Sequence, residues 1–596
     1  MKRNRLRFAA TTTAALLFIL NVPAQENDVV QLPSTASGIS IPPYSHGIAL
    51  EMGHWNNVFS TWNDKQSVTF LQLLRNLHDR RGALMIRLGG NSQDAVQLDE
   101  SINTPVAKTG EQAVRTNSGA TTYNIKVNSQ MFRAMRQLSE VVGGLKWMFG
   151  LNFEHANDMQ SAQQLGRLAV NILGGSTSNN SYDNVLYALQ IGNEPDLYAK
   201  HGMRSPDWGV ADYTGEWLDW AHQLSNEFGT SQYRPDLFSG GVVCCTWQLQ
   251  DLLDSGYFDS AKHMLNSITV QRYSSNACFG VAKGTVNDYL SHDWITSLAR
   301  DAYEKPIQRI VEEGKQVIMG ETNTAACGGI QGISDTYVST LWWVDWQLFL
   351  YSIGFSSIQL QLGGNNAHYN PMSKVGGSWV ANPVYYGSLV TAEALGPSDS
   401  GARVVHVTSI EDQKVVYAIF HHDSLAYTVL INLDADNDAS IPLQHPWKSK
   451  TLYAKRLVAN SINERHDIHW AGQTLKGAVD GMFKGDIHID SIECSDEENC
   501  AIHVPKASVA LVGPHFPNIT ETSVVDNPYD IGELLNGTAS SNSTTYNSNN
   551  PSSSSGKNNN PLHVPQSHAT SSHHQMAYFV TAWMAILLAV VHHIVL

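Results

Sequence analysis

The sequence predicts an α/β fold, namely a (β/α)8 barrel followed by a C-terminal all-β sandwich. Three observations lead to this prediction. The chain has 596 residues, too many for one compact core. Residues 46–396 alternate apolar runs with helical patterns, and from Gly396 to about residue 515 short strand-like runs alternate with polar turns. Apolar strands that alternate with helices are typical of a parallel sheet covered on both faces. An open doubly wound sheet is the alternative, but no glycine-rich dinucleotide loop follows the first strand.

Eight strand–helix units in about 350 residues fit a barrel. The predicted strands are His46–Met52, Ala83–Gly90, Leu145–Phe153, Val185–Glu194, Leu237–Cys245, Ile268–Ser274, Gln316–Glu321 and Phe355–Gly363. The predicted helices are Val68–Asp79, Ser129–Val142, Met159–Leu173, Thr214–Phe228, Leu249–Leu265, Trp294–Glu313, Asp335–Ser352 and Val384–Leu395.

The region after the barrel is predicted to be a sandwich, because its strands are short and its turns polar. The segment Val29–Ser34, which precedes the barrel, is a candidate extra strand. We therefore expect an N-terminal segment over residues 26–45, the barrel over residues 46–396 and the sandwich over residues 397–515. The predicted sandwich strands are Arg403–Ile410, Val415–His421, Leu425–Leu433, Thr451–Val458 and Ala507–Val512.

Both ends of the chain carry targeting patterns. Residues 1–25 combine a basic start, an apolar run and a small-residue exit, which is typical of a secretory signal peptide. Residues 516–575 form a polar linker rich in Ser and Asn, and residues 576–596 form an apolar tail. Small residues precede that tail and no basic cluster follows it, which favours a GPI-anchor signal. A C-terminal transmembrane helix is the alternative. The expected location is secreted, on the cell surface.

Glycosylation sequons and the cysteines agree with secretion. The sequons begin at Asn179, Asn518, Asn536 and Asn542. The six cysteines are too sparse for a disulfide scaffold, and no spacing indicates a zinc site. Cys494 with Cys500 and Cys278 with Cys327 are candidate disulfide pairs, whereas Cys244 and Cys245, adjacent on a predicted strand, are expected to point to opposite faces.

The charge balance excludes some partners. The chain has 38 Lys and Arg against 54 Asp and Glu, for a formal charge of −16, and no basic cluster stands out in the mature region. Binding to nucleic acid or to densely sulfated polyanions requires many cationic contacts. Neither class is expected as a partner, and the sequence carries no signal for an oligomeric state.

Two glutamates at the ends of apolar strands are the main candidates for chemistry. Glu194 ends the fourth predicted strand in Asn193-Glu194-Pro195, and Glu321 ends the seventh. Carboxyl ends of barrel strands are where active sites lie. Two facing carboxyls are the minimum needed to cleave a glycosidic bond, and an amide beside the acid can hydrogen-bond a sugar hydroxyl. The alternatives are a strand-end turn at Glu194 and, at Glu321, a buried ion pair with Arg87 or Arg272.

Several motifs in the same order resemble the family of heparanases and fungal β-glucuronidases, retaining (β/α)8 glycoside hydrolases of the family 79 type. The resemblance covers roughly residues 40–515. It rests on Arg87-Leu88-Gly89-Gly90, Gly192-Asn193-Glu194-Pro195, Gly320-Glu321-Thr322, Gly328-Gly329, Ser334-Asp335-Thr336 and Trp343-Val344-Asp345.

The resemblance implies Glu194 as acid/base and Glu321 as nucleophile. It also implies a set of substrate-binding residues: Glu51, Asn91, Asn193, Tyr273, Gly328, Gly329, and His368 or Tyr369 in a loop where the family's tyrosine is displaced. The two glycines would bring backbone N–H groups to a uronic acid carboxylate. For the two glycines the alternative is an ordinary turn. For Tyr273 it is a packed rim residue, and for Glu51 it is a structural carboxylate. Gln271-Arg272 departs from the histidines that mammalian members carry before the tyrosine.

These implications lead to one expected function and two alternatives. The first is a β-glucuronidase that removes glucuronic acid, plain or 4-O-methylated, from glycans or proteoglycans. The second is an endo-acting relative that cuts within a uronic-acid polymer, and the third is a non-catalytic glycan-binding surface protein. No metal or organic cofactor is implied, because two carboxyls suffice.

Overall fold

The computed structural model describes residues 29–59, 65–108, 125–155, 158–174, 184–230 and 234–524. The predicted signal peptide, the apolar tail and the linker beyond residue 524 lie outside these ranges. Within them, no helix is both long and apolar enough to cross a bilayer.

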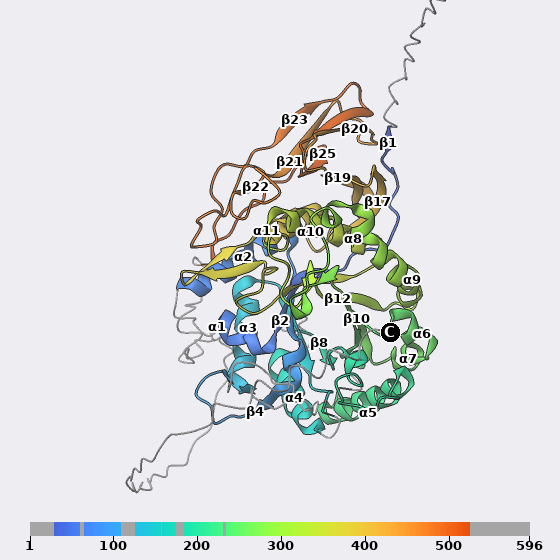
Figure 1. Ribbon diagram of the computed structural model, residues 1–596, viewed down its shortest axis with the longest axis vertical. Helices are drawn as coiled ribbons and strands as arrows, with labels where there is room; N and C mark the ends of the chain where they lie inside the picture. Colours follow the sequence, from blue (N-terminus) through green and yellow to red (C-terminus); the bar gives the residue numbers. More distant parts are fainter. Residues whose placement is uncertain are drawn as a thin grey trace, which may run out of the picture. The chain divides into compact units, whose positions relative to one another are not determined.

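The predicted fold class is confirmed: a closed barrel of eight parallel strands is followed by antiparallel sheets (Figure 1). Each barrel strand pairs with its neighbours in chain order, and the last pairs with the first. The strands are β2 (His46–Glu51), β3 (Leu84–Gly89), β7 (Leu145–Leu151), β8 (Leu186–Ile191), β9 (Phe238–Val243), β10 (Leu265–Gln271), β12 (Gln316–Thr322) and β14 (Ser357–Leu362). At seven strands the predicted carboxyl end lies one to three residues beyond the observed one, because the residues there leave the ladder and begin the loops that follow.

Helices cover the barrel because their apolar faces pack on its strands. They are α2 (Lys65–Arg81), α3 (Ser129–Val142), α4 (Met159–Leu173), α5 (Val210–Phe228), α6 (Leu249–Asp254), α7 (Tyr257–Ala261), α8 (His292–Ala299), α9 (Lys305–Glu312), α10 (Tyr337–Ser352) and α11 (Pro383–Leu395). Two single helices of the prediction are interrupted. Gly256, at φ 79°, separates α6 from α7. A π turn, η7 (Arg300–Glu304), separates α8 from α9, where Pro306 lacks the N–H that a continuous helix needs.

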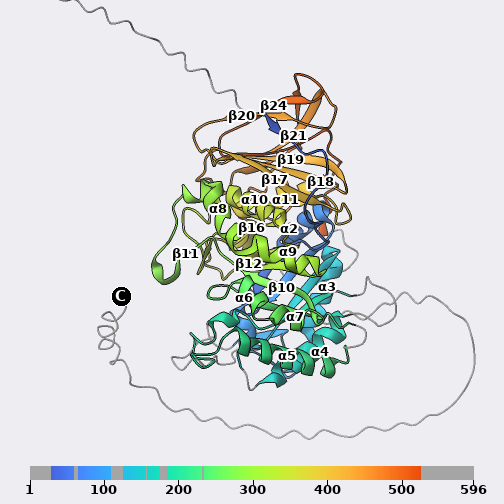
Figure 2. The ribbon, with the colours of Figure 1, turned by 90° about the vertical axis from the view of Figure 1, so that its right-hand side faces the viewer.

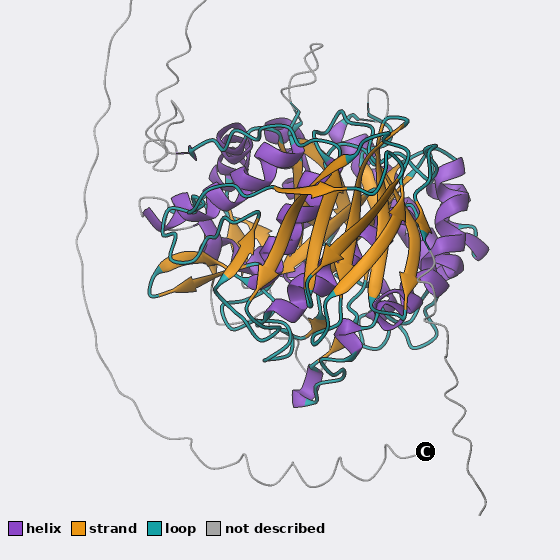
Figure 3. Ribbon diagram, turned by 90° about the horizontal axis from the view of Figure 1, so that it is seen from above, coloured by secondary structure: helices purple, strands orange, loops and turns teal. Residues whose placement is uncertain are grey.

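The C-terminal region contains two sheets (Figures 2 and 3). The larger has the order β17-β18-β19-β25-β21-β22, with β23 also on β21, and the smaller has the order β1-β20-β24. β1 (Val30–Gln31) comes from the segment before the barrel and runs parallel to β20. The other strands are β17 (Arg403–Ile410), β18 (Lys414–His421), β19 (Ser424–Asn432), β20 (Ala439–Gln444), β21 (Thr451–Ala459), β22 (Ile468–Trp470), β23 (Asp490–Glu493), β24 (Asn499–Val504) and β25 (Ser508–Gly513). The prediction missed β20 and β22–β24, which are short or carry several polar residues.

Buried polar contacts join the barrel helices to the larger sheet. Asp345 of α10 is fully buried and accepts hydrogen bonds from Tyr417 at 2.6 Å and from His292 at 2.9 Å. Glu393 of α11 accepts from Lys455 at 2.5 Å. Loss of one partner would leave a buried charge unpaired, so these contacts favour this arrangement of the sheet and the helices.

All six cysteines form disulfides, and one pair differs from the prediction. Cys278–Cys327 and Cys494–Cys500 are bonded. Cys244 and Cys245 are bonded to each other, so the expectation that they point to opposite faces is wrong. The reason is that β9 ends at Val243, and side chains alternate only within a strand.

Candidate active site

Glu321 lies at the end of β12 and its carboxylate is held from both sides. Arg87 Nη1 contacts Oε2 at 2.9 Å, and the Tyr273 hydroxyl donates to Oε1 at 2.6 Å. The residue is only 8% exposed. The two donors stabilise an ionised carboxylate, since charge-assisted hydrogen bonds are the strong ones. The ion-pair alternative therefore holds in the structure, and it leaves Glu321 prepared as an anion.

Arg87 of β3 connects the two glutamate-bearing strands. Its guanidinium is buried and also donates to Gln190 Oε1 at 2.8 Å and to Asn193 Oδ1 at 2.7 Å. All three guanidinium nitrogens of Arg87 therefore donate hydrogen bonds, and they lie in one plane. A lysine, with its single ammonium nitrogen, could not reproduce this arrangement. Arg87 aligns Asn193, beside one glutamate, with Glu321, the other.

Glu194 follows β8 in a left-handed conformation, with φ 50° and ψ 52°. Non-glycine residues in this region are strained and are enriched at functional sites. Its N–H donates to the carbonyl of Val242 at 3.1 Å, and Val242 is itself left-handed at φ 55°. The Gln271 carboxamide lies 2.8 Å from both Arg87 Nη2 and Glu194 Oε1, and with its oxygen assigned to the arginine side its nitrogen donates to Glu194 Oε1. A neutral amide donor is thus the direct partner of the Glu194 carboxyl.

The surroundings of the two carboxyls favour different protonation states for Glu194 and Glu321. Burial, reinforced by the charges of Glu321 and Asp196, raises the pKa of Glu194 to about 8. Burial also raises the pKa of Glu321, but Arg87 and Tyr273 oppose that effect. Because the cation contacts Glu321 directly, the ionised form is favoured at Glu321 and the protonated form at Glu194. This is the division between acid and nucleophile that glycoside cleavage needs.

Asn193, Asn91 and Glu51 form a polar row beside the pair. Asn193 Nδ2 donates to Asn91 Oδ1 at 2.9 Å, and the N–H groups of Asn91 and Ser92 donate to the Glu51 carboxylate at 3.1 and 3.0 Å. Gly90, at φ 74°, is required there because a Cβ would lie 2.3 Å from Glu51 Oε1. Glu51 has the backbone partners of a structural carboxylate, and it remains half-buried at the site.

The glycine loop keeps its backbone amides available. Cys327, Gly328 and Gly329 are all left-handed, with φ 61°, 95° and 83°. Within the part of the chain that the structure describes, the N–H groups of Gly328 and Gly329 donate to no protein acceptor. The Cys278–Cys327 disulfide and the bond from His368 N–H to Gly328 O, at 2.7 Å, hold the loop in place.

The two candidates in the loop after β14 differ. The Tyr369 ring is buried, with its centroid 6.1 Å from that of Tyr273. His368 is 41% exposed at its side chain and lies 3.8 Å from Asp335, which also pairs with Arg465. Tyr369 therefore belongs to the site, whereas His368 contacts residues at the rim of the site.

Two residues of the site were not among the predicted site residues. Arg87 was assigned only as an ion-pair partner, and Gln271 only as a departure from the related sequences. A signal existed for Arg87, since a charged side chain inside an otherwise apolar strand is buried only with a partner. For Gln271 the sequence held no signal, because its contact with Glu194 arises from barrel closure.

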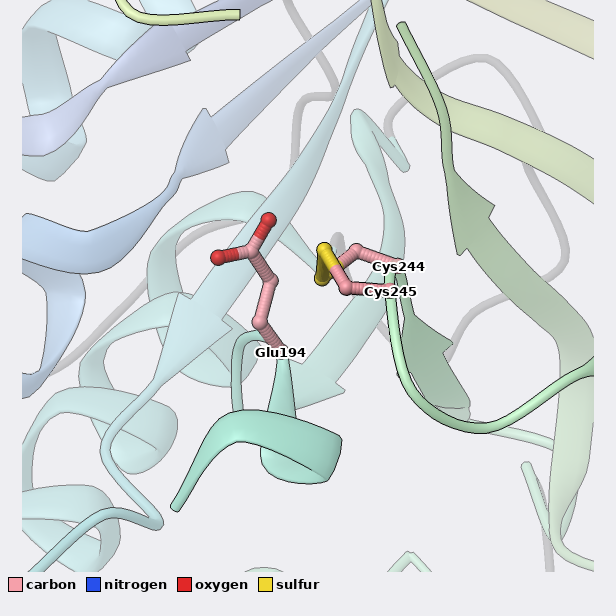
Figure 4. A group of neighbouring side chains, drawn as sticks. All are labelled: Glu194, Cys244 and Cys245. Atoms are coloured by element: carbon pink, nitrogen blue, oxygen red, sulfur yellow. A yellow bond between two sulfur atoms is a disulfide. The ribbon is translucent and has the colours of Figure 1, made fainter. Parts of the chain in front are cut away.

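One group of possible metal ligands occurs among the described residues: Glu194, Cys244 and Cys245 (Figure 4). Metal binding by cysteine requires a thiolate. Both sulfurs are bonded to each other, so this group does not make a metal site.

The chain is similar in sequence to several known proteins. The model of the C-terminal β domain of glycosyl hydrolase family 79 matches residues 416–511. A β-glucuronidase of Neurospora crassa is 25% identical over 478 residues, which is 70% of this chain and 82% of that protein. A β-glucuronidase of Aspergillus niger is 26% identical over 492 residues, which is 74% of this chain and 85% of that protein.

Solved structures show the same fold. A 4-O-α-L-rhamnosyl-β-D-glucuronidase from Fusarium oxysporum superposes with a TM-score of 0.67 at 21% identity, covering 81% of this chain and 100% of the other. A family 51 α-L-arabinofuranosidase from Bifidobacterium longum has a TM-score of 0.53 at 12% identity, covering 81% and 99%.

Proposed function

We propose that this chain, which belongs to a glycoside hydrolase family 79-like family, is a retaining β-glucuronidase. It removes β-linked glucuronic acid, plain or 4-O-methylated, from glycans or proteoglycans. The observation that carries the proposal is the unequal environment of the two glutamates: Arg87 and Tyr273 donate to the Glu321 carboxylate, whereas burial and the charge of Glu321 raise the pKa of Glu194. The curated relatives named β-glucuronidase support the sugar.

The reaction proceeds in two displacements. In the first, Glu321 attacks the anomeric carbon, the glycosidic bond breaks, and Glu194 gives its proton to the departing oxygen. In the second, the Glu194 carboxylate takes a proton from water, and the hydroxide equivalent replaces Glu321 at the same carbon. Two inversions return the starting configuration, and Glu194 ends protonated as it began.

The glycine loop supplies the site for the uronate. The amides of Gly328 and Gly329 are available donors, and glycine lets an anion approach the backbone closely. Donors that need a carboxylate acceptor are left unpaired beside a neutral hydroxymethyl group. They therefore discriminate strongly against a sugar that carries this group. Selectivity for glucuronides over glucosides is assigned to this loop.

The test is hydrolysis of p-nitrophenyl β-glucuronide beside the matching β-glucoside and β-galactoside. Wild type is compared with Glu194→Gln and Glu321→Ala, with Glu313→Gln as the control because Glu313 is a surface glutamate paired with Lys262. We expect release from the glucuronide alone, loss of turnover in Glu321→Ala, and wild-type rates in the control. The first product anomer seen by NMR should be β.

Three results would change the assignment. Release from the neutral glycosides would remove the carboxylate role of the glycine loop. Activity of Glu321→Ala at the wild-type rate would remove the nucleophile. Activity only on internal bonds of uronic-acid polymers would replace the exo-acting enzyme by the endo-acting alternative, and absence of any turnover would favour a glycan-binding protein.

We further propose that the protein is secreted, glycosylated and held at the cell surface by a GPI anchor. Three disulfides and no free cysteine among six are typical of an oxidising compartment. Asn518, in one of the four sequons, is exposed. Treating intact cells with a phosphatidylinositol-specific phospholipase should release the protein. Retention on the cells after treatment, with an anchored marker released, would favour a transmembrane tail instead.

A further inference from the structure

The Cys244–Cys245 disulfide lies directly beside the proposed acid (Figure 4). A carboxylate oxygen of Glu194 and the two sulfurs all lie within 4.8 Å of one another. Cys244 is buried, with 7% exposure, whereas Cys245 is exposed. The pair therefore presents one solvent-facing apolar surface next to the acid.

The turn that carries this disulfide is fixed by its backbone. The Asp196 carboxylate accepts from the N–H groups of Cys244, Cys245 and Thr246 at 3.1, 2.8 and 2.7 Å. Arg272 Nη1 donates to the carbonyl of Cys244 at 3.0 Å. Because Asp196 is buried and lies two residues after Glu194, one short segment positions both the acid and the disulfide.

A stabilising crosslink is a poor explanation for this bond. The stability that a disulfide gives by restricting the unfolded chain increases with the length of the loop it closes. This bond joins adjacent residues, whereas Cys278–Cys327 spans 49 positions. What the bond does change is the surface, because it turns two thiols into a compact group without a hydrogen-bond donor.

The place of the disulfide beside the acid identifies the part of the substrate that it contacts. The acid protonates the oxygen that joins the glucuronic acid to its leaving group, so the leaving group lies against Glu194. The contacts of Glu321 come instead from Arg87 and Tyr273, and no described contact joins the disulfide to Glu321. Sugar rings have apolar C–H faces, and sulfur makes favourable dispersion contacts.

We propose that the Cys244–Cys245 disulfide is the platform on which the first sugar of the leaving group packs. This makes it a determinant of specificity for saccharide over small leaving groups. The inference rests on the proposed function, since it assigns the leaving-group side of the same site.

The experiment compares two substrates that differ in the leaving group. β-Glucuronyl fluoride has no leaving sugar, whereas a β-glucuronyl disaccharide does. The variant Cys244→Ser/Cys245→Ser replaces the platform by two hydroxyls, and Cys494→Ser/Cys500→Ser is the matched control, which removes a disulfide from the sandwich. We expect the ratio of kcat/KM for disaccharide over fluoride to fall roughly tenfold in the first variant and to stay constant in the control.

A second variant separates lost packing from lost structure. Cys244→Ala/Cys245→Met restores an apolar thioether without the bond, and we expect it to recover part of the ratio, mainly through KM for the disaccharide. An unchanged ratio in the serine variant, or equal losses on both substrates in both platform variants, would overturn the inference. If wild type hydrolyses neither substrate, it is the proposed function that fails.

Discussion

Tyr273 donates a hydrogen bond to Glu321 Oε1 across 2.6 Å, from the loop after β10 to the end of β12. The two residues come from neighbouring strands, so the contact exists only because the barrel aligns their carboxyl ends. Burial, reinforced by the charge of Glu321, raises the pKa of Tyr273 well above its usual value, so the phenol stays a donor throughout the working pH range.

Replacing Tyr273 by Phe should lower kcat for the glucuronide by roughly 10- to 100-fold, because a hydrogen bond to a charged group is lost. The acid limb of the pH profile should also move to higher pH, since the Glu321 anion loses a donor. Tyr453→Phe, on the exposed side of β21, is the control. Unaltered kcat in Tyr273→Phe would show that the contact only packs the rim.

Arg87→Lys tests whether the planar guanidinium is needed. A lysine cannot reach Gln190, Asn193 and Glu321 together, so we expect kcat/KM to fall at least about 100-fold while the charge is kept. Steady-state kinetics measure this directly. Arg309→Lys, at a half-exposed pair with Asp259, should have no effect. Equal activity of both variants would mean that the charge alone suffices.

The pH profile of kcat/KM should be bell-shaped. Activity should fall as pH rises through about 8, where Glu194 loses the proton it must donate. The acid limb should reflect the raised pKa of Glu321. Glu194→Gln should abolish the alkaline limb measured with an activated glucuronide. An alkaline limb that persists in this variant would assign it to another group.

The raised pKa of Glu194 also makes the stability of the fold depend on pH. Native Glu194 keeps its proton to higher pH than the unfolded chain does, so the free energy of unfolding should decrease as pH rises from 4.5 to about 8. Urea unfolding at pH 5 and pH 8 should therefore show a smaller decrease for Glu194→Gln than for wild type. Identical decreases would mean that the carboxyl is well solvated.

Gly329→Ala should reduce the preference for glucuronide over glucoside. A Cβ at Gly329 would lie 2.8 Å from the Ser334 hydroxyl and force the loop to move. Gly332→Ala is a matched control, because Gly332 has a similar φ of 84° but open space around it. The ratio of kcat/KM for the two p-nitrophenyl glycosides should change only in the first. Equal ratios would place the uronate elsewhere.

The buried Asp345–His292 pair should matter most below neutral pH. Burial lowers the pKa of His292, but the charge and the hydrogen bond of Asp345 together have the larger effect. The pKa of His292 is therefore raised above 6.5. The resulting stability is fully present below pH 6.5 and is lost as pH rises through the raised value. Asp345→Asn should cost about 1–3 kcal/mol at pH 6 and less at pH 9, by urea unfolding. Asp438→Asn, at an exposed pair with His503, should cost little at either pH.

The barrel, the sandwich and the two glutamates can be predicted from the residue pattern alone. Apolar runs buried on both faces leave few arrangements other than parallel strands under helices, and a carboxyl at the end of such a run must lie at the same edge as its counterpart. The candidates Glu194, Glu321, Asn193 and Tyr273 followed from that edge together with the resemblance.

The groups that contact these carboxyls are known only from the folded chain. Arg87 meets Glu321 across 234 positions, and Gln271 meets Glu194 across strands, so neither contact has a local pattern. The Cys244–Cys245 bond likewise depends on β9 ending two residues earlier than its apolar run suggests. Periodicity in a sequence reports which face of an element is buried, whereas protonation depends on charges that only the closed barrel brings within hydrogen-bonding distance.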